Sequence, residues 1–483
     1  MDNLKRKTAN GFFWAILNSG IAQILNLLFG IFLARLLVPE DYGLVGLLTV
    51  FTAIASTLQT SGLGTGLINL KQPTDNDYNA VFWFNVLVSL LLYVLMFACM
   101  PIIAAFFSQP RLVLIGRVLF LTLPLYALSS TSGTFLQKNL MNREIAIVSI
   151  ISIVISGLVG VMMAFHGFSY WSLVGQQMTS AIVTLVGRRL YVSWRPSLRI
   201  DFTPIKRMFG FCMKLLITNM VYVINNQLLT FIFGRLIPIK TVGYYSQANK
   251  WNNMARSTIG DAVWQISQPV LVSIIDEHNR ELRAFRKMLR FTSFLSFPAL
   301  WGLALVAEEF ILFTIGDKWV ESVPLLRIIC IGGAFMPFYS LYASLVLSNG
   351  RSDIHMWCHI GQMVIQIVLV LVLFKQGIEI VLWSYSTLTA IWLLVWHYRT
   401  KKLIGISFLD LFKDTVPFMA VTAVVIYITY LLTLKIISVP LLLLIRVILA
   451  TLLYAIAMKL LQAQVMKDCV DFLFYKKSRI GGA

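Results

Sequence analysis

The sequence predicts an all-α polytopic membrane protein with about 14 transmembrane helices: two six-helix lobes and a C-terminal helical hairpin. Of its 483 residues, 58% are hydrophobic and 13% are charged, whereas a soluble domain is about a quarter charged. The mean hydropathy is +0.80. A large soluble protein would need more charge to coat its surface, and no hydrophilic stretch is long enough for a soluble domain.

Apolar windows mark the helices one by one, because a span needs about 20 apolar residues to cross roughly 30 Å of hydrocarbon. The first window follows basic residues 5–7, but it is too long for a signal peptide, so we expect an uncleaved first span. The expected spans are 11–37, 42–68, 79–107, 112–136, 145–166, 170–192, 208–237, 241–273, 291–315, 323–348, 354–374, 378–398, 415–434 and 439–461.

Charge predicts the orientation. The net charge is +19, and the Lys and Arg residues gather in alternate loops: before the first span, in 188–207, in 280–290, in 399–402 and in the tail from 467. By the positive-inside rule, we expect both termini to lie in the cytoplasm. The charge therefore gives no reason to expect nucleic acid as a partner.

An internal repeat predicts the domain organisation. Residues 35–43 read RLLVPEDYG and residues 235–243 read RLIPIKTVG, so Arg, Leu and Gly recur 200 positions later. A glycine also leads the sixth span (Gly167) and the twelfth (Gly377). Two halves of six spans enter the membrane in the same sense, which makes a parallel repeat. We expect lobes at 1–200 and 201–400, and a transmembrane hairpin with a basic cytoplasmic tail at 401–483.

Polar side chains in the first two spans of each half predict a central cavity, because polar groups inside a span usually face protein or water. Amides and hydroxyls suit a sugar, and Lys250 and Arg256 suit a phosphate. Helix–helix hydrogen bonds, or an ion pair of these cations with Asp261, are the alternatives. The candidate substrate-binding residues are Asn18, Gln23, Asn26, Gln59, Asn219, Asn226, Lys250, Asn253 and Arg256, with Asp261 a candidate for ion coupling.

Other motifs predict no cofactor, metal or catalytic residue. His355 and His359 are one helical turn apart with Cys358 between them, and we favour a structural role over a metal site. Residues 75–77 read DND, the spelling of a metal-binding D-x-D motif, but in a short loop we expect them to be the solvated acids of a turn. Residues 62–66 read GLGTG but lack the lysine of a phosphate loop, so we expect glycines that close a span. The five cysteines are scattered, which excludes a disulfide framework or thiolate cluster.

The amino-acid sequence resembles the Wzx-type flippases. These form the polysaccharide-transport branch of the multidrug/oligosaccharidyl-lipid/polysaccharide exporter superfamily. The resemblance covers about residues 1–400. It is carried by ARLLVPEDYG from residue 34, SGLG from 61, FWFN from 82, GFSYWSLV from 167, WRP from 194, GRL from 234, GYYS from 243 and GDKW from 316.

This resemblance implies a non-enzymatic exporter of surface polysaccharide precursors. It would move a polyprenyl-pyrophosphate-linked oligosaccharide from the cytoplasmic to the periplasmic leaflet by alternating access, with Lys250 and Arg256 near the pyrophosphate. It would lie in the inner membrane of a bacterium, and its partners would be the lipid-linked oligosaccharide, the bilayer, and a polymerase and glycosyltransferases of the same pathway. Two alternatives stay open: a drug or small-molecule cation antiporter of the same superfamily, and an integral-membrane glycosyltransferase.

Overall fold

A computed structural model describes residues 2–60, 62–198, 200–462 and 466, with side chains from residue 14 on except 15, 16, 211, 214 and 215. The basic side chains at 5–7, the basic tail and Cys469 lie outside this part. The helices are α1 (Asp2–Leu36), α2 (Pro39–Thr60), α3 (Leu63–Asn69), α4 (Asp75–Phe106), α5 (Leu112–Leu119), α6 (Thr122–Lys138), α7 (Asn142–Phe165), α8 (Trp171–Tyr191), α9 (Thr203–Leu236), α10 (Ile239–Ser273), α11 (His278–Leu305), α12 (Ala307–Thr314), α13 (Ser322–Gly333), α14 (Met336–Ser348), α15 (Ser352–Leu373), α16 (Ile378–Ile404), α17 (Phe408–Thr433) and α18 (Val439–Leu460).

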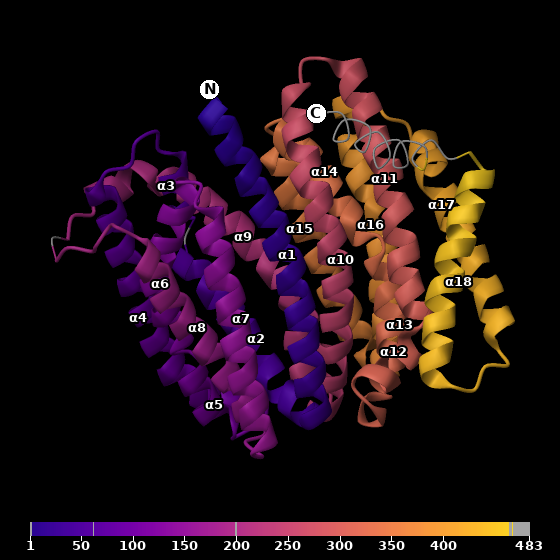
Figure 1. The fold of residues 1–483 in the computed structure, drawn as a ribbon, viewed down its shortest axis with the longest axis horizontal. Coiled ribbons are helices and arrows are strands. Elements are labelled where there is room, and N and C mark those ends of the chain that lie inside the picture. The colour runs from indigo at the N-terminus through magenta and orange to yellow at the C-terminus, as the bar shows by residue number, and fades with distance from the viewer. Residues whose placement is uncertain (1, 61, 199, 463–465, 467–483) are drawn as a thin grey trace. The chain divides into compact units, whose positions relative to one another are not determined.

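The described residues are helical without strands, and successive long helices run in opposite directions (Figure 1). Every predicted span coincides with one helix or with two consecutive helices. Twelve spans are long and apolar enough to cross a membrane, counted over the described residues. The helices α8 and α10 are long enough but fall short in apolarity, so the prediction of fourteen spans is met in part.

Four predicted spans are interrupted: α2 and α3, α5 and α6, α11 and α12, and α13 and α14 each share one window. At the first break Gly62 has φ 69°, a left-handed conformation that a residue without Cβ adopts readily. Gly62 therefore separates α2 from α3, whereas residues 63–66 of the GLGTG segment lie within α3 and do not close the span as expected. The acids at 75–77 begin α4, where Asp77 and Thr74 form a reciprocal capping box.

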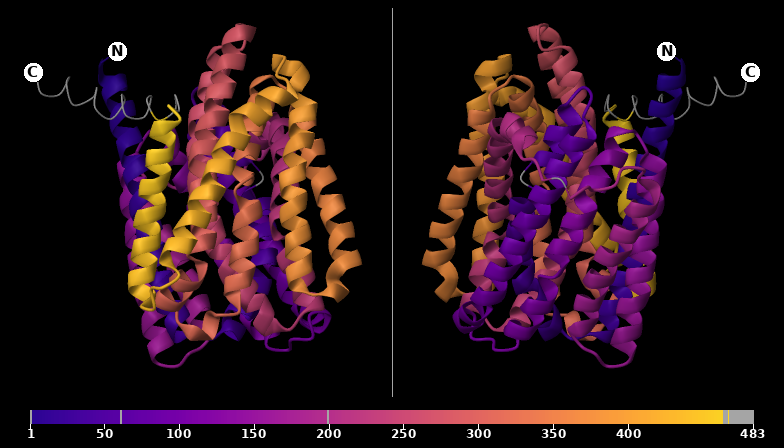
Figure 2. Two further views of the ribbon diagram at one scale, coloured as in Figure 1. Left: turned by 90° about the vertical axis from the view of Figure 1, so that its right-hand side faces the viewer. Right: turned by 90° about the vertical axis from the view of Figure 1, so that its left-hand side faces the viewer.

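Two compact units make up the chain, residues 1–246 and 247–483. In the first, α7 packs against α1 and α8, and α6 against α4 and α8. In the second, α11 contacts α13 and α17, and α16 contacts α13, α14 and α15. Figure 2 shows the helices of each unit running side by side as a bundle. The first unit includes α9, which packs against α2, while the expected lobe limits at 200 and 400 stay a prediction.

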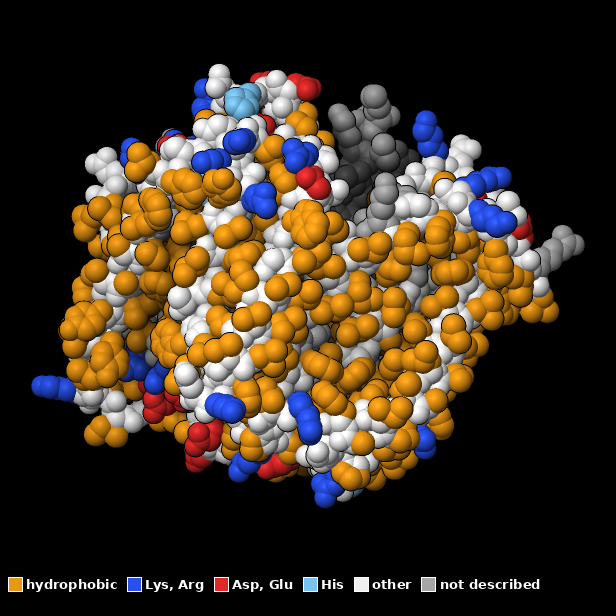
Figure 3. Space-filling view, turned by 180° about the vertical axis from the view of Figure 1, so that it is seen from behind, with side chains coloured by type: hydrophobic (Ala, Val, Ile, Leu, Met, Phe, Trp, Pro, Cys, Tyr) orange, Lys and Arg blue, Asp and Glu red, His pale blue; other side chains and the backbone are white. Residues whose placement is uncertain are grey.

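The surface is that of a multi-pass membrane protein. On the face in Figure 3, hydrophobic side chains cover the long middle stretches of the helices, and charged side chains gather near the helix ends. Large apolar residues are exposed along these helices, including Leu91 (67%), Ile102 (71%) and Val372 (67%). Exposed apolar area on this scale needs a lipid solvent.

The repeated RL…G segments meet within the first unit. A Cβ built on Gly43 would lie 2.3 Å from the carbonyl oxygen of Ile239, and one on Gly243 would lie 1.9 Å from that of Pro39. Gly43 thus packs against Ile239, and Gly243 packs against Pro39. The second contact is the first with each residue replaced by its equivalent in the other segment, 200 positions away. Such reciprocity is the contact pattern of a two-fold axis, and it supports the predicted repeat.

Candidate functional site

The long polar helix α10 carries four of the predicted site residues within the second unit. Lys250, Asn253 and Arg256 are half-buried, and Asp261 is exposed. The opposite side of this stretch is closed, because Asn252 is 2% exposed and its Oδ1 lies where a Cβ on Gly333 of α13 would be. The structure therefore brings Lys250, Asn253 and Arg256 together on the less covered side of α10.

Lys250 and Arg256, the two cations of this group, differ in their hydrogen-bond partners. In the part of the chain that the structure describes, Lys250 Nζ has no ion-pair or hydrogen-bond partner, and it lies 5.5 Å from the centre of the Trp251 ring. Arg256 instead donates from Nε to Asn253 Oδ1 at 2.6 Å. A half-buried ammonium group that has no internal ion pair can bind an incoming anion without breaking one.

The candidates of the first unit are distributed over α1, α2 and α9. Asn26 and Asn219 are exposed, and Asn18 and Gln23 are half-buried. Asn226 is also half-buried and donates its amide to the Tyr222 carbonyl one turn earlier, at 3.0 Å. The two units are each described by themselves, so a cavity that joins these residues to α10 stays a prediction.

Gln59 faces the interior of the first unit. It is 2% exposed, and in the orientation that satisfies its amide, Nε2 donates to the Leu123 carbonyl at 3.3 Å while Oε1 accepts from Ala127 N–H at 3.0 Å. Both partners are backbone groups of α6. Gln59 therefore joins α2 to α6, and we leave it out of the substrate site proposed below.

A buried ion pair holds the C-terminal hairpin, and the sequence analysis did not single it out. Arg446 of α18 and Glu309 of α12 are each about 7% exposed and lie 2.5 Å apart. Arg446 also donates to Thr433 Oγ1 of α17 at 3.1 Å. A lone arginine in an otherwise apolar helix was the available signal, because such a charge needs a partner inside the bilayer.

A second ionic cluster joins the start of α17 to α11. Asp414 is 3% exposed; it accepts a hydrogen bond from Arg286 Nε at 2.7 Å and forms an ion pair with Arg290, whose Nε lies 3.2 Å from Asp414 Oδ1. Arg286 also pairs with Asp410 at 2.7 Å. The hairpin is thus tied to α11 and α12 at both of its ends.

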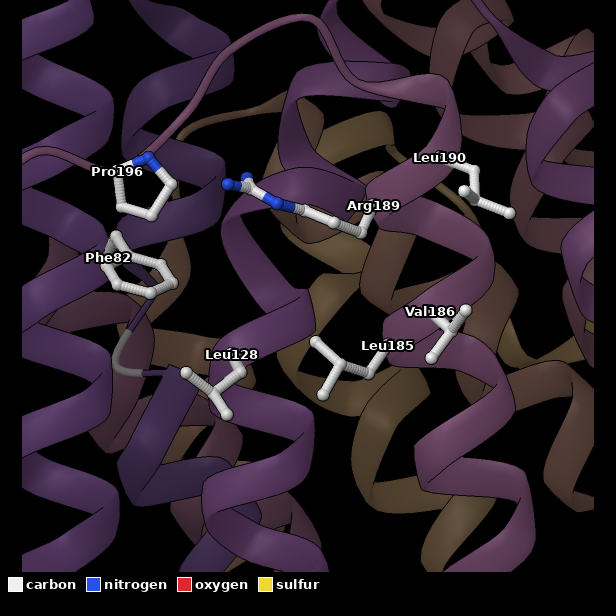
Figure 4. Close-up of a pocket in the computed structure, with 7 residues that line it drawn as sticks. All are labelled: Phe82, Leu128, Leu185, Val186, Arg189, Leu190 and Pro196. Atoms are coloured by element: carbon white, nitrogen blue, oxygen red, sulfur yellow. The ribbon is translucent and has the colours of Figure 1, made fainter.

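Each unit also has an apolar hollow. In the second unit a groove of about 650 Å³ lies between α11, α12, α17 and α18, with Arg446 and Tyr454 among its lining residues. In the first unit a pocket of about 350 Å³ lies between α4, α6 and α8. Figure 4 shows Arg189 reaching across that pocket toward Phe82 and Pro196.

Comparison with known proteins gives the family. Residues 32–324, more than half of the chain, match the family described as polysaccharide biosynthesis protein. The chain belongs to this family. It is thereby a member of the polysaccharide-transport branch of the exporter superfamily that its sequence resembles.

Curated relatives of this polysaccharide biosynthesis family member cover most of its length. It is 26% identical over 360 residues to an uncharacterized membrane protein in the cps region of Klebsiella pneumoniae, with 73% of each chain covered. It is 24% identical to the lipopolysaccharide biosynthesis protein WzxC of Escherichia coli K12, with 73% and 72% covered. It is 22% identical to the teichuronic acid biosynthesis protein TuaB of Bacillus subtilis 168, with 88% of each covered.

Solved structures establish the fold. The lipid II flippase MurJ in an inward closed conformation superposes with a TM-score of 0.72 at 14% identity, covering 93% of this chain and 99% of that one. An inward-facing multidrug resistance MATE family transporter of the MOP superfamily gives a TM-score of 0.63 at 14% identity, covering 81% and 99%. At such identities the likeness concerns the fold alone.

Proposed function

We propose that this protein is a flippase that moves a polyprenyl-pyrophosphate-linked oligosaccharide from the cytoplasmic to the periplasmic leaflet by alternating access. The observation that carries the proposal is Lys250 of α10, which is half-buried, has no ion-pair or hydrogen-bond partner among the described residues, and lies six residues before Arg256. A sugar–phosphate headgroup cannot enter hydrocarbon without replacing its water. The cations and amides on the less covered side of α10 can take the place of that water, while the polyprenyl chain stays in the lipid.

Family membership supports the substrate class. The relatives are named for lipopolysaccharide, teichuronic acid and succinoglycan biosynthesis or transport, and all of these are surface polysaccharides. In this proposal the protein lies in the bacterial inner membrane with both termini in the cytoplasm. The lipid-linked oligosaccharide is its substrate, and a polymerase and glycosyltransferases of the same pathway are its partners.

The test is leaflet transfer of a radiolabelled lipid-linked oligosaccharide in proteoliposomes. A charge-assisted hydrogen bond is worth about 1.5–3 kcal/mol, so Lys250→Gln should raise the Kd for the pyrophosphate lipid by about 10- to 100-fold. Lys250→Arg keeps the charge and should retain most of the transfer. Lys240→Gln is the matched control, because Lys240 lies on the same helix and is exposed.

Three outcomes would contradict the proposal. Equal affinity of the wild type and Lys250→Gln for the pyrophosphate lipid would remove Lys250 from the substrate site. New glycosidic bonds in the product would indicate a glycosyltransferase. Transport of organic cations without lipid transfer would indicate an antiporter, and in that case Asp261 would become the candidate for ion coupling.

A further inference from the structure

One side of α15 is polar where it faces the interior of the second unit. His355, His359, Gln362 and Gln366 follow each other at helical spacing. The last three are 7%, 2% and 1% exposed, because α15 packs there against α14 and α16. The other side of the helix is apolar and exposed, with Val364, Ile365, Val368, Leu371 and Val372.

Aromatic and polar side chains of α14 and α16 complete this cluster. The Trp396 ring of α16 lies 5.9 Å from the His355 ring, 5.5 Å from the His359 ring and 6.0 Å from the Tyr339 ring of α14, measured between centres. We call the residues lining this region of α14, α15 and α16 the inner polar cluster: Tyr339, Tyr342, His355, His359, Gln362, Gln366, Trp396 and His397.

Four residues of the inner polar cluster carry buried polar atoms that have no hydrogen-bond partner among the described residues. Neighbouring groups are satisfied: the Tyr339 hydroxyl donates to the Thr389 carbonyl at 2.6 Å, and Trp392 Nε1 donates to the Cys358 carbonyl at 3.0 Å. The unpaired atoms are His355 Nδ1, Gln362 Oε1, Gln366 Oε1 and Nε2, and Trp396 Nε1.

Unpaired buried polar atoms are rare in proteins because each costs free energy, so a group of them on adjoining helix faces indicates water. The set mixes donors and acceptors: an indole N–H donates, an amide does both, and an imidazole has one nitrogen of each kind when neutral. Water can satisfy all of them. A bare metal ion cannot bind the indole N–H, so the chemistry of the set favours water.

The inner polar cluster reaches from one end of the helices toward mid-membrane. From His355 to Gln366 is eleven residues, or about 16 Å along a helix, which is half of the roughly 30 Å hydrocarbon layer. It begins where α14 ends, α15 begins and α16 ends. The positive-inside rule assigns this end to the cytoplasm.

We propose that the inner polar cluster lines a hydrated pocket, open to the cytoplasmic end of α14–α16, in which histidines take up protons. Histidine is the side chain whose charge changes near neutral pH. Tyr342 donates to or accepts from His397 Nδ1 at 2.8 Å, which links the histidine of α16 to α14.

Titratable and charged groups face the inner polar cluster from each surrounding helix. Because these groups also titrate or carry charge, a change of the protein with pH can be attributed to a histidine only by observing that histidine itself. They are Tyr339 and Tyr342 of α14, Cys358 of α15, Tyr385, Arg399 and Lys401 of α16, and Asp410 and Asp414 of α17.

Radiolytic hydroxyl-radical footprinting of the wild-type protein in membranes tests the water. Radicals form from water beside a side chain, so Trp396 should be oxidised at least several-fold more than Trp319, although both are 0% exposed. Gln366→Leu should lower oxidation of Trp396, whereas Val368→Leu, on the lipid side of the same helix, should not. Equal protection of Trp396 and Trp319 in the wild type would overturn the proposal.

Histidine-labelled NMR tests the protons, since the chain has five histidines and single His→Gln variants assign the signals. At least one of His355, His359 and His397 should change protonation state between pH 5 and 8. A dry pocket would keep all three neutral over this range, because burial disfavours the charged form, and that result would also overturn the proposal. Neither experiment needs a transported substrate, so the outcome is independent of the proposed flippase activity.

Discussion

Replacing Gly243 by alanine tests the close crossing of α2 and the first turn of α10. A Cβ at this position would lie 1.9 Å from the Pro39 carbonyl oxygen, and ordinary contacts begin at 3.4 Å. The backbones must therefore separate by the difference, 1.5 Å. The same substitution at Gly43, where the Cβ would lie 2.3 Å from the Ile239 oxygen, needs 1.1 Å.

The expected cost follows from this geometry. Overpacking costs about 1–3 kcal/mol, and Gly243→Ala belongs at the upper end because the obstructing atom is backbone and cannot rotate away. Alanine recovers about 1 kcal/mol of helix propensity, which leaves a net destabilisation of about 2 kcal/mol. The double variant with Gly43→Ala should cost less than the sum, because both substitutions force the same separation.

Thermal unfolding of the purified protein in one detergent measures this cost as a lower melting temperature. Gly20→Ala is the matched control, since nothing lies within 4 Å of a Cβ there, and it should melt at or above the wild-type temperature. A Gly243→Ala variant that melts with the wild type would refute the close crossing and, with it, the reciprocal contact of the repeat.

Two further predictions concern charges. Glu309→Gln or Arg446→Met alone should destabilise the protein by about 3–5 kcal/mol, because each leaves the other group buried without its partner. The double variant should recover most of this loss. A double-mutant cycle measured by thermal melting tests this, and the absence of coupling between the two substitutions would contradict the buried pair. In the loop before α9, hydrogen bonds from Thr203 and Asn76 lower the pKa of Asp201 to about 2. A carboxyl whose pKa is lower when folded stabilises the fold above its unfolded value and loses that effect as pH falls through the folded value. Proteolysis of this loop should therefore be faster in Asp201→Asn than in the wild type at neutral pH, and the difference should fade only as pH approaches about 2; equal cleavage at neutral pH would argue against the bonds.

Helix positions were predictable because hydrophobic windows determine which segments can lie in lipid. The points at which a span is interrupted were harder to predict. Val306 separates α11 from α12 and has no glycine or proline signal of its own, whereas Gly62 does. Polarity also limits the prediction of α10 as a span, since its amides and cations fit a membrane only when protein or water covers them.

The sequence was enough to predict which polar residues lie on which helix. It was not enough to predict their hydrogen-bond and ion-pair partners. Both Asn253 and Arg256 were among the candidates, and the structure joins them through a hydrogen bond. Gln59 shows the limit, because helical spacing gives a face but not the neighbour, which here is α6. The pairing of Glu309 with Arg446 joins positions 137 residues apart, and no local pattern contains such a contact.

That ion pair has a consequence for how the protein is made. Inserting an arginine at the centre of a helix costs about 2.5–3.5 kcal/mol during translocation, which several leucines must offset. Synthesis delivers Glu309 to the bilayer before Arg446, so the last helix enters a membrane that already holds its counter-ion. A chain that ended before α17 would keep Glu309 and lose Arg446, and so would leave a carboxyl group without its counter-ion.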